Sequence, residues 1–140
     1  MNFITHIKKK KSLSIISEER SPLKIKQLND VLLKNSKSLK YLNITKKNTV
    51  AIVLDNGLDF VVSFLSVINN CISAPLNPNY SIGEFEFYYG DLKPKLIITN
   101  FDEKHPSVVV AKKNNIKIIK ISNCLLEVSS IKKINKDKIK

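Results

Sequence analysis

VAIVLDNGLDFVVSFLSVINNCISAPLNPNYSIGEFEFYYGDLKPKLIIT, residues 50–99, is the stretch that decides the fold. Its first residues, Val50 to Leu54, are apolar and rich in β-branched side chains without polar alternation, which is typical of a strand covered on both faces. Asp55-Asn56-Gly57 then predicts a turn. The stretch therefore begins with a buried strand that ends in a tight connection.

The helix predicted at residues 58–69 is apolar around most of its circumference. One stripe consists of Leu58, Val61, Val62 and Leu65, and a second of Phe60, Phe64 and Val67. Such a helix is expected to lie between two layers. We expect part of its cover to come from outside these 140 residues, so that an uncovered apolar surface favours self-association.

A second helix is predicted at residues 82–90 because its start carries a capping box. Ser81 precedes the helix and Glu84 lies three residues later, while Tyr80 and Phe85 suit a hydrophobic staple. Gly90 suits the C-terminal turn. The aromatic residues recur at helical spacing, which favours core packing over a stacking platform for bases; they are Phe85, Tyr88 and Tyr89, with Leu92.

The spacing of the apolar segments predicts the fold class. Strands are predicted at residues 50–54, 72–76, 95–99 and 116–121, and a third helix at 106–114. A leading helix from Leu23 carries Leu28, Leu32, Leu39 and Leu42 on one face and ends near Asn43. Strands at this pitch with helices between them indicate β–α–β units. The expected fold is α/β, with a partial parallel sheet of about four strands and flanking helices.

The composition divides the chain into three predicted segments: a basic flexible arm at 1–21, the patterned domain at 22–122 and a basic tail at 123–140. Residues 1–48 carry 12 Lys or Arg against 3 acids, residues 49–100 carry 2 against 5, and residues 101–140 carry 10 against 4. Arg20 is the one arginine, although arginine is the side chain best suited to bidentate phosphate recognition. Compositional drift in an A/T-rich gene is therefore preferred to nucleic-acid binding as the source of the net charge.

Other site classes find little support in the sequence. Cys71 and Cys124 stand far apart, and neither pairs with His6 or His105 at a metal-ligand spacing. No apolar run reaches the roughly 18–20 residues of a membrane span. The N-terminus lacks an apolar segment of signal-peptide length, so a cytoplasmic location is expected.

From about Pro22 to Ile121 the chain resembles the early part of the large domain of adenylate-forming acyl-CoA synthetases (AMP-dependent synthetases and ligases). The resemblance is carried by Asn56-Gly57, by APLNPNY and by EFEFYYGDLKPKL, and it is strongest toward the coumarate- and oxalate-CoA ligase branch. Asp55 replaces the family's proline, and Asn43, Lys47 and Asn70 replace glycines. Asn is the residue that best replaces glycine where φ is positive. Lys47 is expected to fit a glycine position less well.

The resemblance implies an enzyme that converts a carboxylate to acyl-AMP with ATP, and acyl-AMP to acyl-CoA. The family's phosphate loop, rich in Gly, Ser and Thr and ending in Lys, has no counterpart in this sequence. The glycines are Gly57, Gly83 and Gly90, and none precedes a GK[ST] element. We therefore assign no catalytic, cofactor-binding or metal-binding residue to this chain; ATP, Mg²⁺ and CoA belong to the full-length family. Asp55 and Asp59 are interpreted as charges near a helix N-terminus, not as a catalytic pair.

Three hypotheses follow. The chain is an N-terminal fragment of a ligase and inactive alone, or it is one subunit of a split ligase completed by a separate chain. The third hypothesis, from a different class, is a basic α/β module that binds a polyanion. The acyl substrate cannot be read from these residues.

Overall fold

The computed structural model describes residues 14–17 and 20–128. In chain order the elements are β1 (Ser14–Ser17), β2 (Arg20–Lys24), α2 (Ile25–Tyr41), β3 (Thr49–Val53), α3 (Leu58–Ile68), β4 (Ile72–Pro75), α4 (Ile82–Leu92), β5 (Leu96–Thr99), α5 (Pro106–Lys113), β6 (Lys117–Ile119), β7 (Ile121–Ser122) and β8 (Leu125–Leu126). Among these residues no helix is both long enough and apolar enough to cross a bilayer.

The main sheet has four strands in the order β4-β3-β5-β6. All three pairings are parallel, with Thr49 opposite Ile72, Val50 opposite Leu96, and Leu96 opposite Lys117. Each strand of this sheet overlaps one of the four predicted ranges, with ends that differ by up to two residues. The predicted α/β fold with a parallel sheet of about four strands is therefore confirmed.

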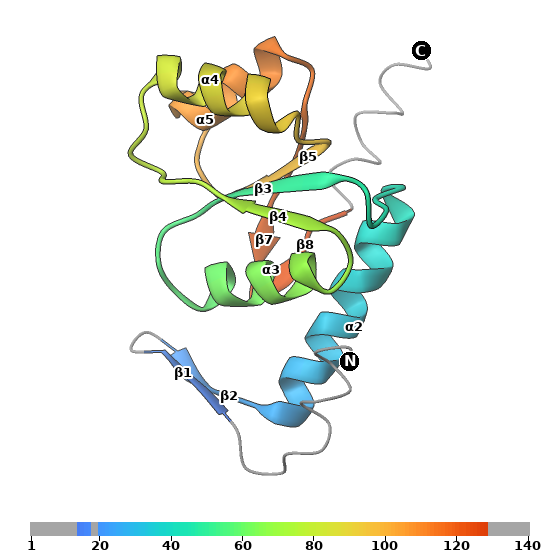
Figure 1. The fold of residues 1–140 in the computed structure, drawn as a ribbon. Coiled ribbons are helices and arrows are strands. Elements are labelled where there is room, and N and C mark those ends of the chain that lie inside the picture. The colour runs from blue at the N-terminus through green and yellow to red at the C-terminus, as the bar shows by residue number, and fades with distance from the viewer. Residues whose placement is uncertain (1–13, 18–19, 129–140) are drawn as a thin grey trace, which may run out of the picture.

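The sheet lies between two helical layers (Figure 1). Alternate residues of β3 serve the two faces, because side chains along a strand point to opposite sides. Val50 and Ile52 join the cluster formed with α2 and α3, whereas Ala51 and Val53 join Phe85 of α4 and Val110 of α5. These four strand residues are fully buried, as the unbroken apolar pattern predicted.

Helix α3 is covered on both of its apolar stripes. Phe60, Phe64 and Val67 face the sheet-side cluster, while Leu58, Val62 and Leu65 pack with Leu28 and Leu32 of α2. The expectation that this helix would leave a large surface open is wrong, because α2 supplies the second layer. The exposed large apolar side chains include Ile68 at the end of α3, and Tyr41, Ile72 and Phe87 outside this helix.

Two short antiparallel hairpins were not predicted. Strand β1 lies inside the stretch assigned to the basic arm and pairs with β2, which begins in that stretch and runs on to Lys24. Strand β7 pairs with β8, so ordered structure continues past residue 122, and Cys124 and Leu126 are buried. The segment IKIIKI, predicted as one strand, is divided into β6 and β7. Residues 1–13 and 129–140, including the KKKK run and most of the predicted tail, lie outside the described residues.

Three helix ends refine the sequence analysis. Asn43 has φ of 58° directly after α2, as expected for its role as a helix stop. Gly90 lies inside α4, and Lys93 supplies the left-handed residue with φ of 46°. Asn70 is not among the residues with positive φ; its amide nitrogen donates to Ser66 O at 2.7 Å and to Ser36 Oγ at 2.9 Å. Side-chain hydrogen bonding therefore explains Asn70 better than backbone conformation does.

Candidate functional site

The carboxyl edge of the sheet is the place where an open parallel sheet binds ligands. The connection from β3 runs through α3 to β4, and the connection from β5 runs through α5 to β6 on the other side. The point where the chain changes direction therefore lies between β3 and β5. The connections after β3, β4 and β5 all meet at this edge (Figure 1).

A cavity of about 420 Å³ opens at this edge beside the switch point. Its lining comes from the segments after β3 and β4: Leu54, Asp55, Asn56, Phe60, Pro75, Leu76, Asn77, Pro78 and Asn79. This volume falls within the range of small-molecule sites, roughly 300–1,000 Å³. The cavity combines one carboxylate and several amides with an apolar floor, so it can bind a polar ligand but offers no cation to an anionic one.

The wall after β4 is held by short-range hydrogen bonds. Leu76 N donates to Ile52 O at 2.9 Å, which fixes this segment against β3. Asn77 Oδ1 accepts from Asn79 N at 2.9 Å, and Asn77 O accepts from Tyr80 N at 3.2 Å. The APLNPNY motif therefore forms a hydrogen-bonded turn that leads into the N-terminal cap of α4.

The turn before α3 depends on Gly57. Its φ of 159° and ψ of −174° belong to a backbone region that is essentially restricted to glycine. Asp55 lines the cavity, whereas Asp59 Oδ1 accepts from Cys124 N at 2.9 Å. The two carboxylates thus have different surroundings, and the structure supports no catalytic pair. Their negative charges flank the N-terminus of α3, which disfavours phosphate there although helix N-termini otherwise attract anions.

The segment after β5 is arranged around an aromatic stack. The rings of Phe101 and His105 are stacked with centroids 3.9 Å apart. His105 Nδ1 accepts from Ser107 N at 3.2 Å and so caps α5. Lys120 Nζ donates to Phe101 O. Each of these groups serves the local structure, so the contacts of His105 give it a structural role at this edge.

The capping box of α4 forms as predicted. Glu84 N donates to Ser81 Oγ at 3.3 Å, and Ser81 N donates to Glu84 Oε2 at 2.7 Å. Hydrogen bonds from the backbone and then the side chain of Ser81 hold the pKa of Glu84 below its usual range. Tyr80 and Phe85 meet edge to face at 5.8 Å, which confirms the staple. Phe85 and Tyr89 are buried in the core, so the helical spacing was correctly assigned to packing.

The surroundings of Cys71 do not activate its thiol. Cys71 is half-buried, and burial raises the pKa of its thiol to about 11. The thiol is therefore protonated near neutral pH, and the thiolate is the reactive form of cysteine. Within residues 14–17 and 20–128 no group of three or more His, Cys, Asp or Glu side chains is placed to hold a metal ion.

These residues do not fit a triphosphate. Gly57 is the glycine of a strand–helix turn, but Asp55 and Asp59 surround it, and Gly83 and Gly90 lie on the exposed side of α4. A phosphate cradle needs several converging backbone amides and a cation. The cavity in the described part of the chain is lined by one carboxylate and by amides, with no lysine or arginine among its lining residues.

Sequence reasoning missed one buried polar group that organises the layer below the sheet. Asn35 is fully buried in α2. Its Nδ2 donates to Cys124 O at 2.9 Å and to Ser66 Oγ at 3.1 Å, and its Oδ1 accepts from Leu126 N at 3.0 Å. The sequence did signal this position, because the apolar residues at helical spacing are interrupted between Leu32 and Leu39. Asn35 takes the core position in that gap.

The sequence profile of AMP-binding enzymes matches residues 6–138. An oxalate–CoA ligase from Saccharomyces cerevisiae is 48% identical over 64 residues, which is 45% of this chain and 12% of that protein. Acyl-CoA synthetase ALT10 from Alternaria alternata is 36% identical over 100 residues, which is 67% of this chain and 18% of that protein. The chain thus spans less than a fifth of the length of these curated relatives.

The fold has a counterpart among solved structures. Apo MatB from Rhodopseudomonas palustris aligns with a TM-score of 0.76 over 92% of this chain and 27% of MatB, at 15% identity. At that identity the likeness concerns the fold alone. The resemblance found in the sequence, including its lean toward oxalate–CoA ligases, is confirmed by these matches.

Proposed function

The chain belongs to the family of AMP-binding enzymes. From that membership we propose that residues 22–122 form the N-terminal part of the large domain of an ATP-dependent acyl-CoA synthetase. The proposed enzyme converts a carboxylate to acyl-AMP and then to acyl-CoA, in the cytoplasm. The observation that carries the proposal is the match of the family over residues 6–138, together with the likeness to oxalate–CoA ligases.

In this proposal residues 22–122 serve as a structural scaffold for the active site. The parallel strands β3, β4 and β5 hold the segments 54–57, 76–81 and 100–105 at one edge, where they supply one wall of a larger site. ATP, Mg²⁺ and CoA are bound by residues outside this 140-residue chain, because no phosphate cradle or cation faces the cavity of the described part. The acyl group that the whole enzyme takes is left open.

The 140 residues by themselves are proposed to be inactive. Transition-state stabilisation in adenylation requires preorganised groups around the phosphates, and the cavity presents Asp55 in their place. The test is carboxylate-dependent exchange between ATP and pyrophosphate, measured with the purified 140-residue chain and a panel of carboxylic acids that includes oxalate. We expect exchange at the background level.

Robust exchange by the chain alone, with any acid, would contradict this proposal. Exchange that appears only when a second polypeptide supplies the rest of the synthetase would identify a split ligase. The same preparation reports on self-association, which we propose because Tyr41, Ile72 and Phe87 are exposed. A sedimentation coefficient that stays at the monomer value as concentration rises would contradict that part.

A further inference from the structure

The parallel topology sorts the connecting segments between two edges of the main sheet, and their charges differ. At the carboxyl edge, segments 54–57, 76–81 and 100–105 and the residue after β6 contain Asp55, Asp102 and Glu103 against Lys104 and Lys120. At the amino edge, segments 42–48, 69–71, 93–95 and 114–117 contain five lysines and no acid; these amino-edge lysines are Lys46, Lys47, Lys93, Lys95 and Lys117. All five are exposed. Basic composition alone does not predict this separation.

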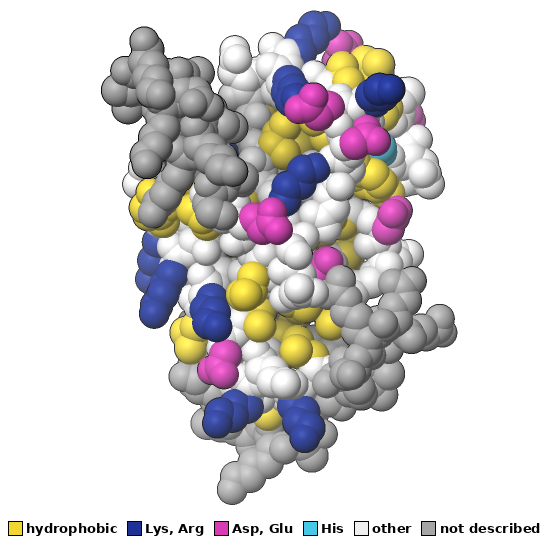
Figure 2. Space-filling view, turned by 180° about the vertical axis from the view of Figure 1, so that it is seen from behind, with side chains coloured by type: hydrophobic (Ala, Val, Ile, Leu, Met, Phe, Trp, Pro, Cys, Tyr) yellow, Lys and Arg dark blue, Asp and Glu magenta, His cyan; other side chains and the backbone are white. Residues whose placement is uncertain are grey.

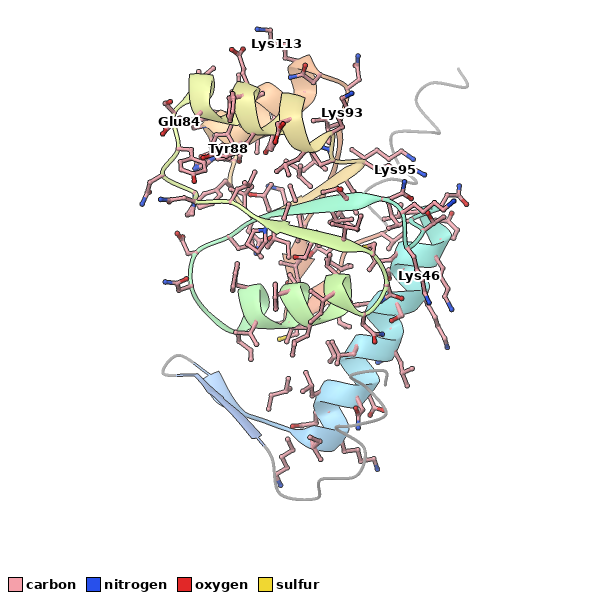
Figure 3. All side chains as sticks on the ribbon, in the orientation of Figure 1. Lys46, Glu84, Tyr88, Lys93, Lys95 and Lys113 are labelled. Atoms are coloured by element: carbon pink, nitrogen blue, oxygen red, sulfur yellow. The ribbon has the colours of Figure 1, made fainter. Side chains whose placement is uncertain are left out.

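Backbone contacts place these lysines along one continuous rim. Lys95 N donates to Thr49 O at 2.9 Å, and Lys95 Nζ donates to Asn43 O at 2.8 Å. Lys117 stands opposite Leu96 at the start of β6. Figure 3 shows Lys46, Lys93 and Lys95 spread along the side of the molecule where the strands begin, opposite to Glu84 and Tyr88.

Two lysines at the end of α5 are paired with acids. Lys112 Nζ lies 2.7 Å from Glu103 Oε1, and Lys113 Nζ lies 2.7 Å from Glu86 Oε1. Lysines and acids accordingly alternate over α4 and α5 in Figure 2. Within the part of the chain that the structure describes, neither of these ion pairs involves an amino-edge lysine. The rim is therefore one region of concentrated positive charge on the described surface, and α2, with Lys26, Lys34, Lys37 and Lys40 against Asp30, is another.

Exposed apolar side chains lie on the same rim. Ile72 begins β4 and is 51% exposed, and its N–H donates to Asn48 O at 2.9 Å, next to Lys47. Ile68 ends α3 at 42% exposure, and Tyr41 ends α2 at 59%. Lysine and apolar side chains lie side by side at the left-hand margin of Figure 2, which is this end of the sheet seen from behind.

We propose that the amino edge of the sheet binds the surface of an anionic phospholipid membrane. Lysines near an anionic bilayer gain electrostatic attraction, while isoleucine and tyrosine side chains enter the interfacial region. This pairing of charge with aliphatic side chains fits lipid headgroups better than nucleic acid. Nucleic-acid recognition favours arginine and stacked aromatic rings, and the rim offers lysines, two isoleucines and a single tyrosine. The binding leaves the carboxyl edge and its cavity turned away from the lipid.

The experiment is co-sedimentation of the 140-residue chain with phosphatidylcholine vesicles that contain or lack phosphatidylserine. The test variant carries Lys46→Gln, Lys47→Gln and Lys93→Gln, and leaves Lys95 with its hydrogen bond to Asn43. The matched control carries Lys26→Gln, Lys34→Gln and Lys104→Gln, which removes the same charge from exposed positions on α2 and at the carboxyl edge.

We expect the chain to bind the phosphatidylserine vesicles in a salt-sensitive manner. The test variant should lose affinity by about a hundredfold, since each lysine beside an anionic surface contributes a factor of about five. The control should lose far less. Ile72→Thr should weaken the binding that remains at high salt, whereas Phe87→Ser on α4 should not.

Four results would overturn the proposal. The first is no binding to anionic vesicles, and the second is an equal loss in the test and control variants, which would indicate net charge alone. The third is a lower Tm in the test variant with unchanged vesicle binding, because lysines near helix C-termini also offset helix dipoles. The fourth is a selective loss of nucleic-acid retention, with vesicle binding unchanged, in the test variant.

Discussion

Asn35 joins three elements through one buried amide group. It connects α2 with Ser66 of α3 and with the turn and second strand of the β7–β8 hairpin, through Cys124 O and Leu126 N. The bonds to Cys124 and Leu126 span 89 and 91 positions of the chain. Ser66 Oγ also donates to Val62 O at 2.7 Å, so it keeps one bond without Asn35. The amide of Asn35 therefore fixes the β7–β8 hairpin against the two helices.

Replacement of Asn35 by leucine tests this arrangement. Asn35→Leu keeps a side chain of similar size but removes its three hydrogen bonds from the core, so we expect a loss of about 2 kcal/mol in the free energy of unfolding. Urea unfolding at low protein concentration measures it. Lys37→Leu, an exposed change in the same helix, should alter stability by no more than about 0.5 kcal/mol. Equal stability of Asn35→Leu and the parent would show that the network contributes nothing.

At the scale of the element, α4 depends on its N-terminal cap. Ser81→Ala removes the acceptor for Glu84 N, and we expect it to cost about 1 kcal/mol in thermal or denaturant unfolding. Ser107→Ala makes a poor control because Ser107 is buried, whereas Ser122→Ala is exposed and should be nearly neutral. A Ser81→Ala protein as stable as the parent would show that the Ser81 cap does not stabilise α4.

The same cap gives a pH dependence with a definite sign. Because the pKa of Glu84 is lower in the folded chain than its usual value, its contribution is present above the unfolded pKa and is lost as pH falls through the folded pKa. Glu84→Gln should therefore be less stable than the parent near neutral pH, and the two should converge in acid. A stability difference that grows on acidification would contradict this assignment.

At the scale of the whole molecule, the sequence was informative where residues contact near neighbours in the chain. Val50–Leu54 and Leu96–Thr99 are apolar at nearly every position because helices cover both faces of the sheet, so their burial could be predicted. The Ser81–Glu84 cap and the Pro106 helix start are local as well. The strand order was not predicted, because order depends on how the connections cross the sheet.

Features made by contacts between distant segments escaped the sequence analysis. The cavity is formed by residues 54–60 and 75–79, and neither set carries a binding signature alone. The β7–β8 hairpin has two residues in each strand. It is bonded to α2 through Asn35, which lies 91 positions from Leu126 in the sequence. The cover of α3 by α2 was likewise invisible, which is why its surface was expected to be open.

The central claim is that this chain supplies a scaffold layer of an acyl-CoA synthetase and none of its catalytic groups. The most direct measurement is oxalate-dependent formation of oxalyl-CoA by a chimera of the yeast oxalate–CoA ligase, in which the segment aligned with this chain is replaced by the matching residues of this protein. We predict that the chimera retains activity close to that of the parent ligase, and that Asp55→Ala within it changes little. A chimera that folds, shown by cooperative unfolding, but makes no oxalyl-CoA would contradict the claim.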